Sequence, residues 1–235
     1  MRNTRVRWFA PALMLGLALP LFAQEKKEPA KPAAPAAKEA PKPAAPAPAP
    51  AKETTKAAAP APAAGGVAIG KPAPDFKLKD TAGKDVSLAD YKGKIVVLEW
   101  ANAGCPVCKR HATGGTAAKV VGNFKDKGEV WLNIDSTKDA KADDCKKFAA
   151  DNKLGTYLMD PTGATGKAYG AKTTPHCFVI DTKGNLAYMG AIDDDNDGKK
   201  GDKAVNYVKD AIDAILKGSA VAKATTEPYG CSVKY

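Results

Sequence analysis

Two cysteines separated by two residues, Cys105 and Cys108, have the residue type and spacing that predict chemistry in this chain. They follow an apolar run at residues 95–100, so we expect them where a strand ends and a helix begins. A helix N-terminus supplies partial positive charge and free backbone N–H groups, which stabilise a thiolate and lower its pKa. One thiolate can attack a partner's disulfide, and the second can resolve the mixed disulfide that forms. The pair therefore predicts thiol–disulfide exchange.

The elements that position this pair are predicted from apolar periodicity. Strands are expected at residues 75–79, 95–100, 130–135, 157–160, 178–181 and 186–189, and helices at 106–125, 139–151, 164–169 and 203–216. Gly114 and Gly115 mark a weak point within the first of these helices. Strands that alternate with helices, followed by a hairpin and a final helix, predict an α/β sandwich with a mixed central sheet flanked by helices.

Residues 1–23 have the three parts of an export signal. Three arginines precede the almost wholly apolar residues 8–22, and a small residue suited to cleavage ends the segment. An uncleaved membrane anchor is the alternative, but the apolar run is shorter than the ~20 residues of a spanning helix. Pro11 and Pro20 also interrupt it. We therefore expect an exported protein, periplasmic or secreted, with membrane contact only if the signal is retained.

Residues 24–66 consist almost entirely of Ala, Pro, Lys, Glu and Thr, which predicts an extended, disordered linker. Residues 67–235 are then one domain, large enough for its own core. The net charge of +10 includes +3 from the signal and +3 from the linker, which leaves +4 on the domain. The sequence has no basic stripe interleaved with aromatic residues, so nucleic-acid binding is not expected.

Four segments of the domain are similar to segments of a known protein family. They are GKPAPDF at residues 70–76, the strand with Cys-Pro-Val-Cys at 95–108, Thr-Thr-Pro at 173–175, and PYGCSVKY at 228–235 together with GAIDD at 190–194. With these segments the domain resembles a thioredoxin-fold redoxin of the alkyl hydroperoxide reductase and thiol-specific antioxidant family, in an exported peroxiredoxin-like subgroup.

The resemblance implies a role for several residues. Cys105 would be the nucleophile and the more exposed sulfur, and Cys108 would resolve. Pro175, if cis, would place the backbone of Thr174 beside the sulfurs, where it can pair with a bound peptide. Glu99 would be a buried acid that moves protons to Cys108, and burial would raise its pKa toward neutrality.

Pro106 lies between the two cysteines, and Trp100 ends the strand before them. Both are further candidates for substrate contact, with core packing as the alternative for Trp100. The expected partners are protein thiols and disulfides, with a membrane or soluble electron donor. No cofactor or metal is expected. The direction of electron flow is left open because it depends on thiolate stabilisation and on the partner.

A thiol peroxidase with Cys105 as peroxidatic cysteine is the first alternative function. The resemblance implies that a peroxidase has Thr or Ser three residues before that cysteine and Pro seven before it. Asn102 and Leu98 occupy these positions. Disulfide exchange is therefore the preferred interpretation.

A copper-binding module that uses His111 or His176 is the second alternative. Among the other cysteines, Cys145 lies on an apolar helical face and is expected in the core. Cys177 is expected to be buried near the site. Cys231 has two open interpretations, as a second resolving cysteine or as a partner of Cys145.

Overall fold

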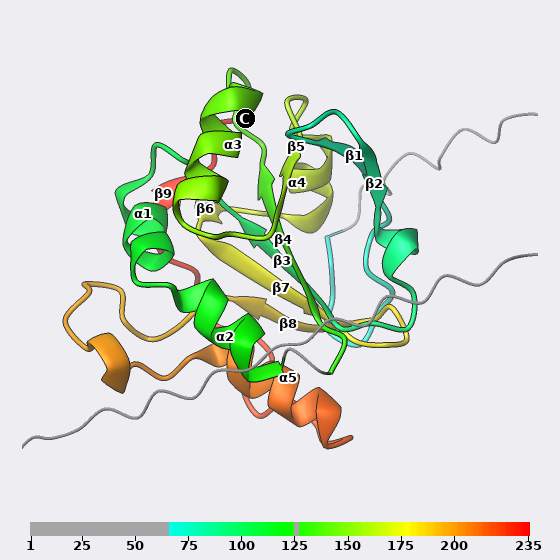
Figure 1. The fold of residues 1–235 in the computed structure, drawn as a ribbon. Coiled ribbons are helices and arrows are strands. Elements are labelled where there is room, and N and C mark those ends of the chain that lie inside the picture. Colours follow the sequence, from blue (N-terminus) through cyan, green and yellow to red (C-terminus); the bar gives the residue numbers. More distant parts are fainter. Residues whose placement is uncertain (1–65, 125–126) are drawn as a thin grey trace, which may run out of the picture. The chain divides into compact units, whose positions relative to one another are not determined.

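Seven strands form one mixed sheet in the computed structural model, which describes residues 66–124 and 127–235 (Figure 1). The predicted export signal and residues 24–65 of the predicted linker lie outside the described residues. The order across the sheet is β2-β1-β5-β4-β3-β7-β8. The strands are β1 (Lys77–Asp80), β2 (Asp85–Ser87), β3 (Val96–Trp100), β4 (Val130–Asp135), β5 (Thr156–Met159), β7 (His176–Ile180) and β8 (Leu186–Gly190). Strands β3, β4 and β5 are parallel, and the other pairings are antiparallel. The expected α/β architecture with a mixed sheet is confirmed.

Five α-helices connect or follow these strands. They are α1 (Pro106–Thr113), α2 (Thr116–Phe124), α3 (Ala142–Asp151), α4 (Ala164–Tyr169) and α5 (Tyr207–Leu216), with short 3₁₀ helices η1 (Leu88–Tyr91) and η2 (Gly201–Lys203). The single helix expected over 106–125 is two helices. Gly115 has the left-handed φ of 67°, which glycine adopts at little cost, and the chain breaks there between α1 and α2. Helix α5 begins later than expected, at a cap in which the Asn206 side chain accepts from the backbone N–H of Lys209.

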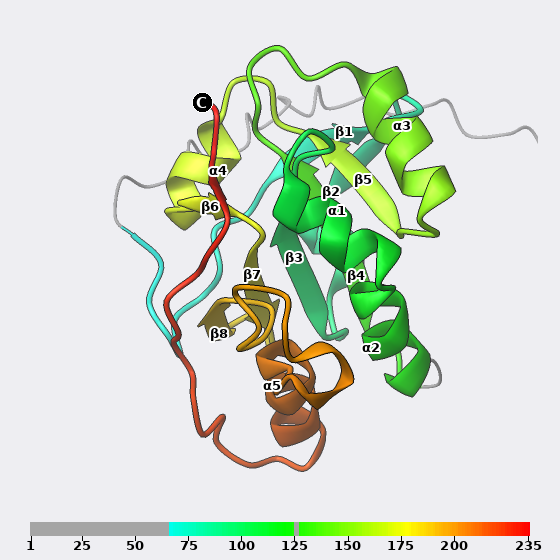
Figure 2. The same cartoon turned by 90° about the vertical axis from the view of Figure 1, so that its left-hand side faces the viewer.

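The two faces of the sheet bury separate clusters of side chains, as the alternation of β3 requires. Val97 packs with apolar residues of α2 and α5 on one face. Leu98 and Trp100 pack on the other face, where Tyr169 of α4 covers them. Figure 2 shows α4 on one side of β3 and α1 and α2 on the other. The central strand is therefore buried on both faces, which fixes the loop that follows it.

A second, small sheet joins β6 (Thr173–Thr174) to β9 (Cys231–Ser232). The two strands are antiparallel, with Thr174 paired to Cys231. In Figure 1 the C-terminal segment, in red, brings β9 to the neighbourhood of α1 and β6. The sequence did not predict β9.

Within the described ranges, no helix is both long and apolar enough to span a membrane.

Candidate redox site

Cys105 occupies the N-cap position of α1, directly after the loop that leaves β3. Pro106 follows at the first helical position, where its fixed φ suits a helix start and its missing N–H costs nothing. The side chain of Asn102 holds the loop on both sides. Its Oδ1 accepts from the backbone N–H of Gly104 at 2.7 Å, and its Nδ2 donates to Thr137 Oγ1 at 2.6 Å. The nucleophile candidate therefore sits on a rigid corner between a buried strand and a helix.

The loop that precedes β7 lies against this corner. The Thr174–Pro175 peptide bond is cis. The carbonyl oxygen of Thr174 lies 3.1 Å from Cys105 Sγ. The structure thus places the backbone of Thr174 beside the sulfur, in the arrangement expected for pairing with an extended peptide.

Both cysteines of the pair are buried, with 3 % of Cys105 and 2 % of Cys108 exposed. Cys105 is the more exposed of the two residues, as expected, but only by a small margin. The C-terminal strand β9 covers it, because Cys231 Sγ lies 2.8 Å from Cys105 Sγ. The exposed residues at this corner are Gly104 and Pro106, so Pro106 remains available to a partner.

The two sulfurs of the pair have pKa values shifted in opposite directions. The pKa of Cys105 is lowered to about 4, chiefly by a hydrogen bond from the Cys108 side chain, with further help from Cys231. The pKa of Cys108 is raised by that same hydrogen bond, by burial and by the charge of Glu99. These directions favour the thiolate at Cys105 and the thiol at Cys108 at neutral pH, in agreement with the roles of attacking and resolving cysteine that the resemblance implies.

This assignment predicts the pH dependence of Cys105 alkylation. In the reduced protein, the rate constant with iodoacetamide should stay nearly constant above about pH 6, because the thiolate is already fully formed there. Pulses of iodoacetamide between pH 4 and 9, followed by mass spectrometry of the tryptic peptide 95–109, measure that rate. A rate that rises tenfold per pH unit toward about 8.5, as for a free cysteine, would contradict the assignment.

Glu99 is buried in β3 and accepts a hydrogen bond from Trp131 Nε1 at 2.9 Å. Burial raises its pKa to about 7, against a smaller lowering by Trp131. A cavity of about 10 Å³ is lined by Glu99, Cys108 and Asn133. Both polar side-chain atoms of Asn133 are buried without a hydrogen-bond partner in the protein. A polar space of that size is about what one water molecule needs, so it can join the carboxyl group to the resolving thiol.

Trp100 does not have the position predicted for a substrate contact. Its side chain is fully buried, 5.1 Å from the ring of Phe178 and 5.2 Å from that of Tyr169. Its indole nitrogen donates to Ser136 Oγ at 3.0 Å. Alternation along β3 directs Trp100 to the face opposite Glu99, so the packing alternative is the correct one.

The two histidines lie in separate surroundings. His111 Nε2 lies 3.0 Å from the Tyr229 hydroxyl, and His111 Nδ1 lies 3.2 Å from Thr116 Oγ1. His176 Nδ1 accepts from the backbone N–H of Lys172, and burial lowers the pKa of His176 to about 4. In the part of the chain that the structure describes, no three His, Cys, Asp or Glu side chains gather in a metal-site arrangement.

The remaining cysteines take different places. Cys145 is buried, with its sulfur 3.7 Å from Asp135 Oδ2. Cys177 is fully buried and lies opposite Glu99 in the β3–β7 register. Cys231 Sγ contacts Cys105 Sγ, a position that the first of the two interpretations left open for Cys231 requires. Sequence reasoning missed Tyr229 and Gly230, although the motif that contains them, at 228–235, was recognised.

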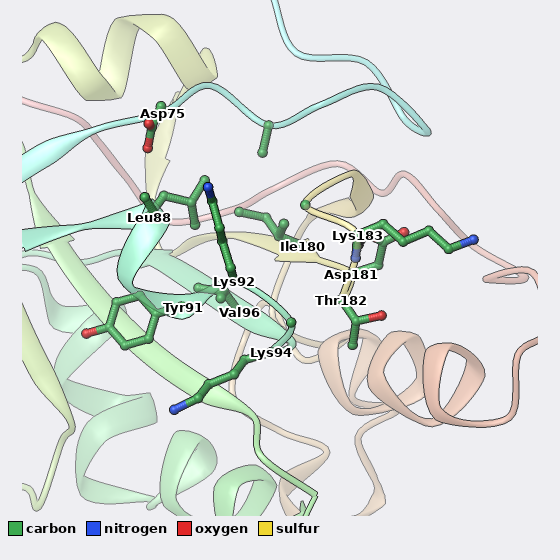
Figure 3. A pocket seen from close by; sticks show the side chains of 14 residues that line it. Asp75, Leu88, Tyr91, Lys92, Lys94, Val96, Ile180, Asp181, Thr182 and Lys183 are labelled. Carbon is green, nitrogen blue, oxygen red and sulfur yellow. Dashed lines mark hydrogen bonds between the residues drawn. The ribbon is translucent and has the colours of Figure 1, made fainter. Parts of the chain in front are cut away.

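A larger cavity lies away from these residues (Figure 3). Its volume is about 430 Å³. It is lined by Ala73, Asp75, Leu88, Ala89, Tyr91, Lys92, Gly93, Lys94, Val96, Ile180, Asp181, Thr182, Lys183 and Gly184. Val96 begins β3 whereas Cys105 follows its end, so roughly 13 Å of strand separates this cavity from the cysteine corner. None of the predicted site residues lines it.

The thioredoxin-like sheet and the Cys-x-x-Cys corner together define a thiol-redox class of domain. Residues 69–189, about half of the chain, match the AhpC/TSA family, and the chain belongs to that family. The resemblance to the alkyl hydroperoxide reductase and thiol-specific antioxidant family is thereby confirmed.

Curated relatives of the chain are named thiol-disulfide oxidoreductase ResA. The protein of that name from Bacillus thuringiensis subsp. konkukian is 32% identical over 120 residues, which cover 50% of this chain and 66% of the relative. The one from Bacillus subtilis is 29% identical over 122 residues, which cover 51% of this chain and 65% of the relative. The matches thus span just under two thirds of these relatives' lengths.

Two crystal structures show the same fold over more of the chain. A hypothetical protein from Sinorhizobium meliloti has a TM-score of 0.66 at 27% identity, over 72% of this chain and 95% of that one. An uncharacterized conserved protein from Geobacillus kaustophilus has a TM-score of 0.63 at 28% identity, over 72% of this chain and 92% of that one.

Proposed function

We propose that this chain is an exported thiol–disulfide oxidoreductase that exchanges disulfides with protein partners through Cys105 and Cys108. The observation that supports it most is the position of Cys105. This sulfur has a lowered pKa at the start of α1 and lies 3.1 Å from the carbonyl oxygen of Thr174, beside the cis proline. The nucleophilic sulfur of Cys105 therefore lies beside the backbone of Thr174, which can pair with a peptide.

The reaction follows from the two pKa directions. The Cys105 thiolate attacks one sulfur of a partner's disulfide, forms a mixed disulfide and releases the other partner sulfur as a thiolate. Cys108 then loses its proton toward Glu99 and attacks Cys105 Sγ. The Cys105–Cys108 disulfide forms, and the partner leaves as a dithiol after protonation. Two electrons pass from the enzyme to the partner, and a donor must return them.

Export rests on the pattern of residues 1–23, and the partners on the relatives' printed activity. Protein thiols and disulfides outside the cytosol are the proposed substrates. A membrane or soluble dithiol protein is the proposed electron donor. The linker at 24–66 would hold the domain away from the surface from which the chain is exported.

A comparison of two activities tests this function. Reduction of insulin disulfides with dithiothreitol as electron source, and consumption of hydrogen peroxide, are measured on the wild-type protein and on Cys108→Ser. We expect the wild type to accelerate insulin reduction and Cys108→Ser to lose most of that acceleration, because the mixed disulfide is resolved poorly. If the wild type never reduces insulin, and peroxide turnover survives in Cys108→Ser, the peroxidase alternative replaces this proposal.

A further inference from the structure

The chain's own C-terminus lies where the proposed function puts a partner peptide. Residues 225–235, here called the tail, carry β9 along the edge of β6 that faces Cys105. Thr174 pairs with Cys231 in that ladder, and Thr174 Oγ1 lies 3.4 Å from the Cys231 carbonyl oxygen. The Cys231 sulfur lies 2.8 Å from Cys105 Sγ. A cysteine within a strand paired to β6 is the geometry of a substrate presenting its sulfur to the nucleophile.

The tail is anchored on both sides of Cys231, so this position is built into the fold. The anchoring contacts are Thr226 Oγ1 with Tyr188 Oη and the Ala191 N–H, Tyr229 Oη with His111 and Asp193, Val233 N–H with the Lys172 carbonyl, and Tyr235 Oη with the Ala171 carbonyl. Figure 2 shows the tail, in red, running from the neighbourhood of β8 past β6 to the side of α4.

Gly230 permits the close approach of the tail to β6. Its φ of +126° lies in a region that side-chain-bearing residues rarely adopt. A Cβ atom at this position would collide with the carbonyl group of Thr174, 2.8 Å from its carbon, and would lie 3.2 Å from Pro175 Cδ. The backbone of the tail thus touches the loop that carries the cis proline, immediately before the residue that presents the sulfur.

The charge state of Cys231 fits a contact with a thiolate. Its pKa is raised, chiefly by its hydrogen bond to Cys105, and the pKa of Cys105 is lowered in part by the same bond. In the reduced protein, Cys231 is therefore a thiol that donates to the Cys105 thiolate. Cys105 accepts hydrogen bonds from two thiols, since Cys108 also donates to it.

We propose that Cys231 is a third redox-active cysteine, which exchanges with Cys108 for the disulfide to Cys105. The proposal rests on the proposed function, because it uses the oxidised state that the reaction leaves. The Cys231 thiolate attacks Cys105 Sγ of the Cys105–Cys108 disulfide. The Cys105–Cys231 bond forms as the Cys105–Cys108 bond breaks, and the electron pair leaves on Cys108. The proton lost by Cys231 is balanced by one taken up at Cys108, and no external oxidant is needed.

The exchange gives the oxidised protein two forms. In one the disulfide lies within α1, and in the other the tail is bound covalently at the β6 edge as a tethered substrate.

Tryptic peptides separate the two forms. Cys105 and Cys108 lie together on peptide 95–109, and Cys231 lies on peptide 224–234, whereas Cys145 and Cys177 lie on 142–146 and 173–183. Reduced wild type and Cys108→Ser are equilibrated with oxidised glutathione, quenched with N-ethylmaleimide, and digested without reduction. We expect a 95–109/224–234 cross-link in the wild type and its predominance in Cys108→Ser. If Cys105 of Cys108→Ser ends only as the glutathione mixed disulfide, with Cys231 alkylated, the proposal is overturned.

A variant that leaves all five cysteines in place tests the role of the tail strand. Gly230→Ala should lower the yield of the cross-link by about tenfold, because the methyl group displaces β9 from Thr174. Gly218→Ala is the matched control, since Gly218 also has positive φ, at 67°, but has open space around its Cβ position. Equal cross-link yields in the two variants would contradict a tail that must dock on β6.

These outcomes are distinguishable from a failure of the proposed function. A wild type that forms the cross-link but does not reduce insulin retains Cys231 as a partner of Cys105 and loses the oxidoreductase proposal. A wild type that reduces insulin through Cys105–Cys108 without any cross-link retains the oxidoreductase and loses the third cysteine.

Discussion

Replacing Cys105 with serine lowers the rate of insulin reduction by about 10³-fold or more, to the rate of dithiothreitol alone. Two disulfides can form at this site, Cys105–Cys108 and Cys105–Cys231, and both contain the sulfur of Cys105. A serine hydroxyl stays protonated at neutral pH, whereas the pKa of the Cys105 thiol is lowered to about 4. Neither remaining sulfur replaces the nucleophile, because the pKa values of Cys108 and Cys231 are both raised.

The control for this variant is Cys145→Ser. Cys145 is also buried, and its contact is with Asp135, which a serine hydroxyl can make as well. We expect this variant to keep the wild-type rate, measured at equal concentrations of folded protein. Retention of more than about a tenth of the wild-type rate by Cys105→Ser would show that another sulfur starts the reaction.

Glu99→Gln slows the resolving step by about 10²-fold at neutral pH. Cys108 has a raised pKa and must lose its proton before it attacks, and Glu99 lines the same small cavity. With a pKa of about 7, the carboxyl group is partly ionised at neutral pH and can accept that proton. Glutamine keeps the size and the polarity but accepts no proton. Stopped-flow measurement of release from a preformed Cys105 mixed disulfide isolates the step.

The pH profile distinguishes a proton acceptor from a structural residue. In the wild type the release rate should rise as pH passes through about 7 and then level off, and the glutamine variant should lack this inflection. The free energy of unfolding should fall over the pH range in which the release rate rises. Because the folded-state pKa lies above the ordinary 4.5, the stability contributed by protonated Glu99 is fully present below about pH 4.5 and is lost as pH rises through about 7. Urea unfolding at pH 5 and pH 8 should therefore show a loss in the wild type that Glu99→Gln lacks. If the release rate of Glu99→Gln shows the same inflection near pH 7 as the wild type, Glu99 is not the proton acceptor in the resolving step.

Local sequence patterns were sufficient for the parts of the site that are close in sequence. The strand that precedes Cys105 is a continuous apolar run and lies within a residue of its expected bounds. The helix that follows Cys105 begins at Pro106, where it was expected to begin. The break at Gly115 was visible as a weak point, but propensity alone did not separate one kinked helix from two. The α/β class followed from the alternation of elements, which depends on no single boundary.

Two features could not be derived from local patterns. The face to which Trp100 points is ambiguous in the sequence, because β3 is buried on both sides and lacks polar alternation. The contact of Cys231 with Cys105 joins residues 126 positions apart. It is made through a two-residue strand, too short for a periodic signal. The nearest sequence signal was Gly230 directly before Cys231, since a glycine beside a reactive residue often marks a close backbone approach.

The shortness of β9 has a consequence for partner choice. Only Cys231 and Ser232 pair with β6, yet the tail is covalently linked to the domain, so its effective concentration at the β6 edge is on the order of millimolar. A free peptide competes with this internal occupant, and its apparent affinity falls by the corresponding factor. A longer extended segment can add main-chain hydrogen bonds that two residues do not make. We therefore expect an extended polypeptide longer than two residues to displace β9 from β6 more readily than a shorter one.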